Sequence, residues 1–127
     1  MEIHFTNREL DVMAVLWENG AATVSEVRDR LGDTLAYTTV LTVLRTLERK
    51  GFVGHAQEGK AYRYYPLVER EKAGESALRR ITRKMFRGSP DLLLTQLVSD
   101  RSLSESELQR LRALLDERLQ RDERKEE

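Results

Sequence analysis

Apolar residues recur three and four positions apart along most of this chain, which is the spacing of amphipathic helices. Two such helices are expected near the N-terminus. Each begins at a threonine followed three positions later by a glutamate, a pair that can cap the first helical turn. Each ends at a glycine, which can adopt the left-handed conformation common after a helix. The first helix is therefore expected from Thr6 to Gly20 and the second from Thr23 to Gly32.

A third segment, residues 35–50, has helical spacing but an unusual composition. Its apolar residues are Val40, Val43, Leu44 and Leu47, and Asp33 or Thr34 can cap its start, while Gly51 can end it. The opposite face carries Thr38, Thr39, Thr42, Arg45, Thr46 and Arg49. Six β-branched residues cost such a helix roughly 2–3 kcal/mol in intrinsic propensity. We therefore expect the short, forked side chains of this face to serve a function.

Two strand-like segments follow, at residues 52–57 and 60–65. The pair Glu58-Gly59 is expected to form a tight turn between them, and Pro66 is expected to end the second strand. Three helices followed by a hairpin is the order of a winged helix-turn-helix domain, which we assign to residues 1–67. A small helical bundle shares the first three elements, but the hairpin favours the winged form.

Beyond Pro66 the sequence predicts a charged helix at residues 68–87, a short apolar helix at 91–98, and a last helix after a Ser104/Glu107 capping pair. Three amphipathic helices have too few neighbouring elements in a monomer to bury all of their apolar faces. We therefore predict a helical dimerisation domain at residues 68–120 and a frayed tail at 121–127; packing against the N-terminal domain is the alternative. The residues expected to face a second copy are Leu78, Ile81, Met85, Leu93, Leu97, Leu108, Leu111 and Leu115.

Composition excludes several classes of function. The chain has no cysteine, and its two histidines, His4 and His55, show no metal-ligand spacing. We find no glycine-rich phosphate loop, nucleophile elbow or paired His-Glu motif, so we expect neither an enzyme nor a cofactor or metal site. No segment resembles a signal peptide or reaches membrane-spanning length, so we expect a cytoplasmic protein.

The distribution of charge permits binding to nucleic acid but does not decide it, since a solvated surface of mixed charge shows the same asymmetry. The whole chain is neutral, but residues 37–66 carry five basic and two acidic side chains. Threonine offers a hydroxyl for phosphate or base edges and a methyl for thymine, and arginine can bind guanine with two hydrogen bonds. The candidate residues for binding double-stranded DNA are Thr38, Thr39, Thr42, Arg45, Thr46, Arg49 and Lys50 on the helix and Lys60 on the hairpin. A winged-helix module for protein interaction and a repressor that senses a ligand directly remain as alternatives.

Three segments, AYTTVLTVLRTLERKGFV, GKAYRYYPLV and LSESELQRLRALLDE, resemble the penicillinase-repressor family of the BlaI/MecI type. The resemblance extends from about Thr6 to about Glu117. It implies a homodimeric transcriptional repressor with a winged-helix DNA-binding domain and a helical dimerisation domain. It also implies palindromic operators with TACA/TGTA-like half-sites.

The resemblance carries an expectation about release from DNA. In the antibiotic-resistance members, a membrane sensor-protease that detects β-lactams triggers cleavage of the repressor within its dimerisation domain. The corresponding bond here lies within Leu94–Val98, near Gln96 and Leu97, where this chain lacks the Asn-Phe pair of some members. Members that respond to copper carry a C-terminal cysteine cluster, which is absent from this chain.

Overall fold

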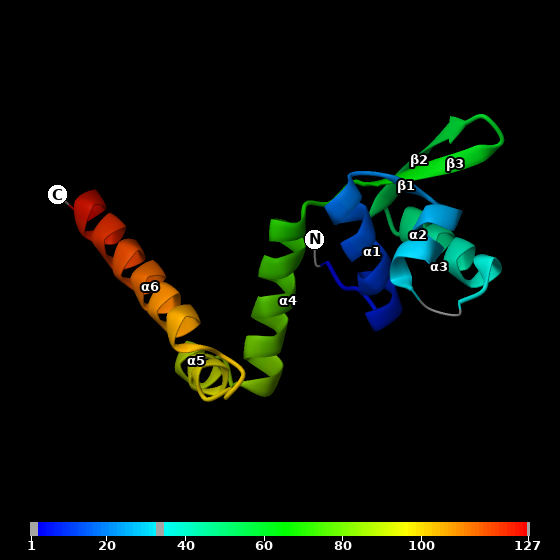
Figure 1. Cartoon of the computed structure of the whole chain (residues 1–127). Helices are drawn as coiled ribbons and strands as arrows, with labels where there is room; N and C mark the ends of the chain where they lie inside the picture. Colours follow the sequence, from blue (N-terminus) through cyan, green and yellow to red (C-terminus); the bar gives the residue numbers. More distant parts are fainter. Residues whose placement is uncertain (1–2, 33–34, 127) are drawn as a thin grey trace. The chain divides into compact units, whose positions relative to one another are not determined.

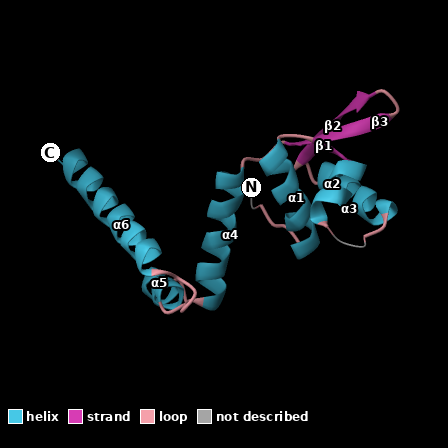
Figure 2. Cartoon of the chain, in the orientation of Figure 1, coloured by secondary structure: helices cyan, strands magenta, loops and turns pink. Residues whose placement is uncertain are grey.

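The computed structural model describes residues 3–32 and 35–126 of the chain (Figure 1). Its elements are α1 (Asn7–Asn19), β1 (Ala22–Thr23), α2 (Val24–Leu31), α3 (Tyr37–Arg49), β2 (Val53–Glu58), β3 (Ala61–Pro66), α4 (Arg70–Met85), α5 (Pro90–Val98) and α6 (Glu105–Glu126). The fold is mainly helical, and its strands gather in one small sheet (Figure 2). This matches the predicted class, a winged helix-turn-helix with further helices after it.

The first two helices begin and end as the sequence predicts. Thr6 Oγ1 accepts a hydrogen bond from the Glu9 N–H at 3.1 Å, and the Glu9 carboxylate accepts one from the Thr6 N–H at 2.8 Å. Thr23 Oγ1 accepts from the Glu26 N–H at 3.2 Å at the start of α2. Gly20 and Gly32 follow the two helices with φ angles of 85° and 60°, a region that favours glycine.

The third helix is also present. Val40, Leu44 and Leu47 are buried, and Val43 is half-buried. Ala36 precedes α3 and supplies no side-chain cap hydrogen bond. The residues that we expected to cap this helix, Asp33 and Thr34, lie outside the described residues.

The hairpin is present, but its turn is shifted by one residue from the prediction. Glu58 pairs with Ala61, so the turn consists of Gly59 and Lys60 and not of Glu58 and Gly59. Gly59 has a φ of 61°, and glycine at the first of two turn positions is the arrangement of type II′ hairpins. The prediction failed because it placed the glycine second in the turn.

The sheet has a third strand that the sequence did not predict. Its order is β1-β3-β2, all antiparallel, with Ala22 paired to Tyr64 and Thr23 to Arg63. A strand of two residues is too short to show an alternating pattern. It nevertheless attaches the segment before α2 to the hairpin.

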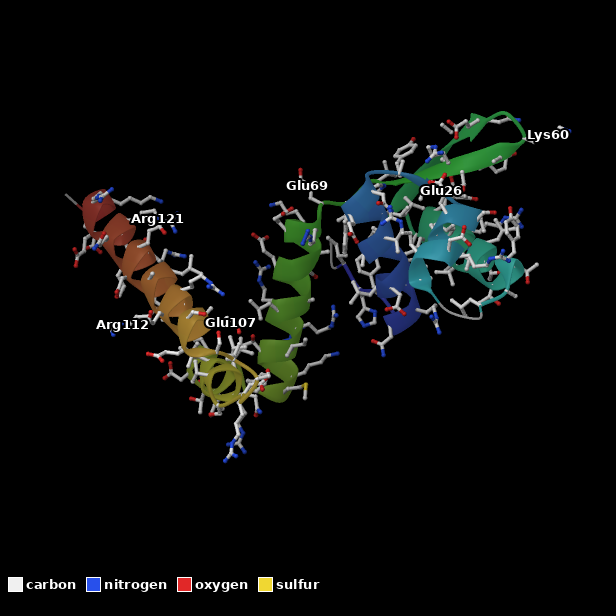
Figure 3. All side chains as sticks on the ribbon, in the orientation of Figure 1. Glu26, Lys60, Glu69, Glu107, Arg112 and Arg121 are labelled. Carbon is white, nitrogen blue, oxygen red and sulfur yellow. The ribbon has the colours of Figure 1, made fainter. Side chains whose placement is uncertain are left out.

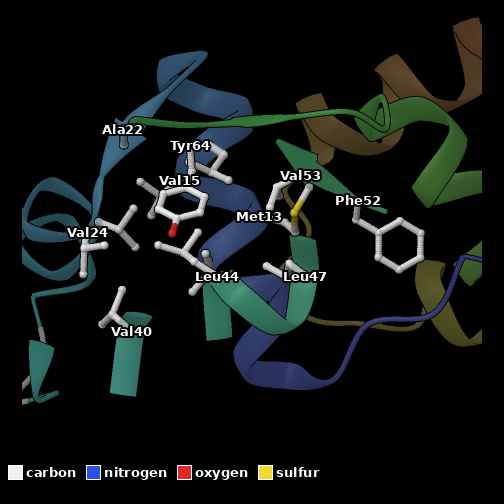
Figure 4. Close-up of a cluster of buried hydrophobic side chains, with 13 residues drawn as sticks. Met13, Val15, Ala22, Val24, Val40, Leu44, Leu47, Phe52, Val53 and Tyr64 are labelled. Carbon is white, nitrogen blue, oxygen red and sulfur yellow. The ribbon is translucent and has the colours of Figure 1, made fainter. Parts of the chain in front are cut away.

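Side chains from α1, α2, α3 and the sheet meet in one core (Figure 4). Met13, Leu16, Leu44, Leu47 and Tyr64 are among its fully buried members. Burial raises the pKa of the Tyr64 phenol. The core therefore holds the buried face of α3 and leaves its threonine-rich face outside.

The beginning of α4 packs with this core. The Trp17 Nε1–H donates a hydrogen bond to the Val68 carbonyl at 2.8 Å, and Ala73 is buried. The Ile3 N–H donates to Ser76 Oγ at 3.1 Å, and that hydroxyl donates to the Ile3 carbonyl at 3.0 Å. The chain accordingly divides into two compact units, Met1–Arg80 and Ile81–Glu127. This division falls inside α4, whereas the sequence suggested a boundary after Leu67.

The second unit contains α5, α6 and the end of α4. Ser104 and Glu107 form the predicted reciprocal cap, with hydrogen bonds of 3.1 Å and 3.0 Å. Helix α6 continues to Glu126, and the frayed tail expected at residues 121–127 stays a prediction. Arg118 pairs with Asp122 one turn later at 3.2 Å, an arrangement that supports an exposed helix. None of the helices within the described ranges has both the length and the apolar character needed to cross a bilayer.

Candidate nucleic-acid interface

The outer face of α3 carries the predicted threonine and arginine residues. Successive residues of an α-helix are rotated by about 100°, which places Thr38, Thr42, Arg45 and Arg49 opposite the buried residues of α3. These four side chains are exposed, as is Thr39, whereas Thr46 is half-buried. The burial of one face therefore presents the other face to solvent as a single surface.

Two of the threonines already use their hydroxyl protons within the helix. Thr42 Oγ1 donates to the Thr38 carbonyl at 2.8 Å, and Thr46 Oγ1 donates to the Thr42 carbonyl at 2.9 Å. Arg49 donates to Thr46 Oγ1 at 3.2 Å. Such bonds to the preceding turn are a known alternative for threonine in helices. Thr42 and Thr46 can therefore offer a methyl group or an accepting oxygen to a ligand more readily than an O–H donor.

The positive charge of Lys50 is balanced by an ion pair. Its ammonium lies 2.8 Å from Glu9 Oε2, and Glu9 is only 4% exposed. Burial alone raises the pKa of the Glu9 carboxyl, but Lys50 and the Thr6 N–H outweigh burial and leave the pKa below its usual value. Lys50 therefore forms an ion pair between the end of α3 and the start of α1, and its role in DNA binding stays a prediction.

Arg63 forms a second set of ion pairs, which the sequence did not reveal. Its Nη2 lies 2.9 Å from Glu26 Oε1 on α2, and its guanidinium also contacts Glu58 Oε2 at 2.9 Å. The hydrogen bond from Arg63 lowers the pKa of the Glu26 carboxyl, and Glu26 and then Glu58 raise the pKa of Arg63. Arg63 thus attaches β3 to α2, and its charge is balanced locally.

His55 lies within β2, opposite Tyr64 in the register, and not at the hairpin tip. Its Nδ1 contacts Glu48 on α3, and its ring lies 4.6 Å from that of Tyr62. Together, the Arg63–Glu26 and His55–Glu48 contacts attach the hairpin to both helices of the helix-turn-helix.

Three basic side chains of residues 37–66 stay available. Among the described residues, Arg45, Arg49 and Lys60 form no ion pair with a carboxylate. Lys60 extends from the tip of the hairpin (Figure 3). A polyanion that contacts the outer face of α3 and the hairpin tip can therefore meet unbalanced positive charge at both.

The residues predicted to mediate dimerisation are incompletely buried. Exposed fractions reach 73% for Met85 and 52% for Leu115. Leu78, Ile81, Leu97 and Leu108 are also exposed, and Leu93 and Leu111 are half-buried. Among their described residues, α5 and α6 contain no buried side chain. Gln96 and Leu97, the candidates for cleavage, are exposed residues within α5.

A family model described as penicillinase repressor matches residues 5–117. The chain belongs to the penicillinase repressor family. Two curated relatives match it along most of their length. The methicillin resistance regulatory protein MecI of Staphylococcus aureus is 24% identical over 89% of this chain and 94% of its own. The penicillinase repressor of Bacillus licheniformis is 25% identical over 88% of this chain and 89% of its own.

A solved structure supports the fold. A MarR family protein from Bacillus stearothermophilus is 23% identical to this chain and has a TM-score of 0.52, covering 94% of this chain and 76% of its own. Membership of the repressor family makes this chain a DNA-binding regulator and not an enzyme, as the sequence predicts.

Proposed function

We propose that this chain is a homodimeric transcriptional repressor that acts in the cytoplasm. In this proposal each protomer places α3 in the major groove of a palindromic operator, and the β2–β3 hairpin contacts the flanking phosphates. The observation that carries the proposal is the outer face of α3, where Thr38, Thr42, Arg45 and Arg49 form an exposed stripe opposite the core. A protein-binding surface is enriched in aromatic residues and depleted in charge, so this stripe supports DNA over a protein partner.

The exposed apolar residues of the second unit support dimerisation. A hollow of about 430 Å³ runs along α6 and is bordered by Leu103, Leu111 and Leu114. A leucine-rich face of this extent needs a partner surface, and a second copy presents the same residues. A dimer holds two reading helices together, so that the second half-site contact becomes intramolecular.

Cleavage near Gln96 and Leu97 offers a route to release. The two residues lie inside α5, and a cut there separates α6 from the rest of the chain. Loss of α6 weakens the dimer and thereby lowers operator affinity without altering α3. In this proposal the protease belongs to a membrane sensor system that responds to a β-lactam or another cell-envelope signal.

The experiment that tests the repressor is selection of bound fragments from the source genome by the purified full-length chain at physiological salt. An enriched two-fold symmetric motif upstream of a few genes is expected. Absence of a motif, together with binding that disappears uniformly as salt rises, contradicts sequence-specific repression. Retention of a protein partner at high salt with no DNA binding favours the interaction module.

The variant Arg45→Ala tests the reading surface. We expect a loss of about 1–3 kcal/mol in binding to the selected operator and a smaller loss on random DNA, because a base contact is removed. The matched control is Arg121→Ala on the exposed surface of α6 (Figure 3), which should keep wild-type affinity. Equal losses on operator and random DNA make Arg45 a phosphate contact. No loss on either removes it from the interface.

A further inference from the structure

The first unit contains a cavity that DNA recognition does not use. Its volume is about 270 Å³, and it lies between the N-terminal segment, α1 and the first half of α4. Its apolar walls come from Ile3, Phe5, Leu10 and Trp17, and α4 contributes Ala73, Gly74 and Ala77. These small residues leave the space open, since a Cβ added at Gly74 meets no atom within 4 Å.

The walls of this cavity are held by specific contacts. The Phe5 ring packs edge-on against Trp17 and Phe52, with centroid distances of 6.0 Å and 4.9 Å. The Trp17 N–H is bonded to the Val68 carbonyl, and both backbone polar groups of Ile3 are bonded to Ser76. Each of these wall residues is therefore held in place by contacts within the first unit.

The charged side chains of the lining are positive. Arg70 and Arg80 border the cavity, and none of the described residues that line it is a carboxylate. They are ten residues apart on α4, about 15 Å along a helix axis. Arg80 already donates to the Ile3 carbonyl at 3.2 Å. Arg70 is exposed and forms no ion pair with a carboxylate among the described residues.

Two other hollows differ in this respect. The hollow between Trp17 and residues 66–71 is bordered by Glu69 and Glu71 as well as Arg70. The hollow along α6 is bordered by Glu107 and Glu117 as well as Arg110. Carboxylates at the rim repel an acidic ligand, whereas an apolar cavity with an unpaired cationic group at its rim favours one.

We propose that the cavity bordered by Trp17, Gly74 and Arg70 is a binding site for a small apolar carboxylate. Its apolar body occupies the space between Phe5, Trp17 and α4, and its carboxylate pairs with Arg70 at the rim. The sequence left open a repressor that senses a ligand directly. This cavity is the location that we propose for such a ligand. Binding at this site does not depend on the DNA-binding function.

Trp17 is the only tryptophan of the chain, so its fluorescence reports on this cavity. The test titrates the full-length protein, without DNA, with benzoate and with its neutral analogue benzamide at neutral pH. Benzoate is expected to change the Trp17 emission saturably and to bind about tenfold more tightly than benzamide, because a charge-assisted hydrogen bond is added. No saturable change with either compound overturns the proposal.

Two variants make the test specific. Gly74→Leu fills the cavity and should abolish binding, whereas Glu75→Leu adds the same side chain at an exposed neighbouring position and should bind as the wild type does. Arg70→Gln should remove the preference for benzoate and keep the weak binding of benzamide. Unchanged binding in Gly74→Leu, or an unchanged preference in Arg70→Gln, contradicts the site. Should Gly74→Leu fail to fold, the Arg70→Gln comparison decides. Binding of operator DNA is measured separately with the same protein samples. Absence of operator binding contradicts the proposed repressor but leaves the result for the cavity unchanged.

Discussion

Thr42 shows how one side chain can belong to the helix and to the surface that we propose reads DNA. Its hydroxyl proton is engaged by the Thr38 carbonyl, so the side chain is held in place at an exposed position. The branched side chain costs helix propensity, but the hydrogen bond orders it. The exposed threonines thus give α3 a face with short and restricted side chains.

A pair of substitutions at Thr42 separates the two functional groups. Thr42→Val keeps a methyl and loses the hydroxyl, whereas Thr42→Ser keeps the hydroxyl and loses the methyl. Because the hydroxyl proton is already used within α3, we expect Thr42→Val to keep operator affinity. Thr42→Ser should weaken binding by about 0.8 kcal/mol, roughly fourfold, through the lost methyl contact. Fluorescence anisotropy with operator DNA measures the affinity of each variant. If Thr42→Val binds more weakly than Thr42→Ser, the hydroxyl and not the methyl is the recognition group.

At the scale of elements, α3 is positioned by charge as well as by its apolar face. The Glu9–Lys50 pair joins the first turn of α1 to the residue that follows α3, and Glu9 also caps α1. A buried carboxylate that loses its only cation is costly, since the group stays desolvated. We therefore expect the pair to contribute mainly to the angle at which α3 is held.

A matched pair of lysine variants tests this distinction. Lys50→Met should lower the free energy of unfolding by about 1–3 kcal/mol, because the Glu9 carboxylate loses a charged hydrogen bond. Lys60→Met, at the exposed hairpin tip, should leave stability unchanged and reduce the salt dependence of DNA binding by about one charge. Urea denaturation and salt titrations measure the two effects. If Lys50→Met is as stable as the wild type and its DNA binding depends less steeply on salt, Lys50 is part of the DNA interface.

The same pair predicts how stability depends on pH. The folded-state pKa of Glu9 is below its ordinary value of 4.5, so the ionised carboxylate stabilises the fold. This contribution is complete above the ordinary value and is lost as the pH falls through the folded-state pKa. Glu9→Gln keeps a capping side chain but cannot titrate. The stability difference between wild type and Glu9→Gln should therefore shrink below about pH 4.5; a constant difference in urea denaturation from neutral to acidic pH contradicts this assignment.

At the scale of the whole molecule, α4 is shared between the two compact units. Ala73 and Ser76 in its first part, with Val68 just before it, close the N-terminal core, and its end belongs to the second unit with α5 and α6. The exposed apolar residues that we propose for dimerisation concentrate in the second unit. From the proposed dimer we expect changes in α5 and α6 to lower operator affinity while leaving the first unit folded.

Two truncations test this division. A chain ending at Arg80 should fold cooperatively as a monomer and bind the operator weakly, because it keeps the contacts of α4 with the core and lacks α5 and α6. A chain ending at Pro66 should be less stable, since it loses the Val68 carbonyl and Ser76 as partners of Trp17 and Ile3. Thermal unfolding and sedimentation measure stability and mass. Equal stability of the two fragments, or a dimeric 1–80 fragment, contradicts the division.

What the sequence alone determined is local in origin. The capping pairs Thr6/Glu9 and Ser104/Glu107, the buried stripe of α3 and the exposed threonine face were all predicted correctly. Each depends on residues within a few positions of one another, whose spacing reflects helix geometry. Family membership was likewise readable, since its motifs are continuous segments. The frayed tail at residues 121–127 stays a prediction, because charge composition alone does not show whether ion pairs one turn apart support a helix there.

What only the tertiary structure decided depends on residues far apart in the chain. Lys50 meets Glu9 across 41 positions, Arg63 meets Glu26 across 37, and Trp17 meets Val68 across 51. These contacts determine which basic side chains stay available for DNA and where α4 closes the core. The cavity beside Trp17 likewise needs three separate segments. Periodicity records which face of an element is buried, but it does not record the partner against which that face is packed.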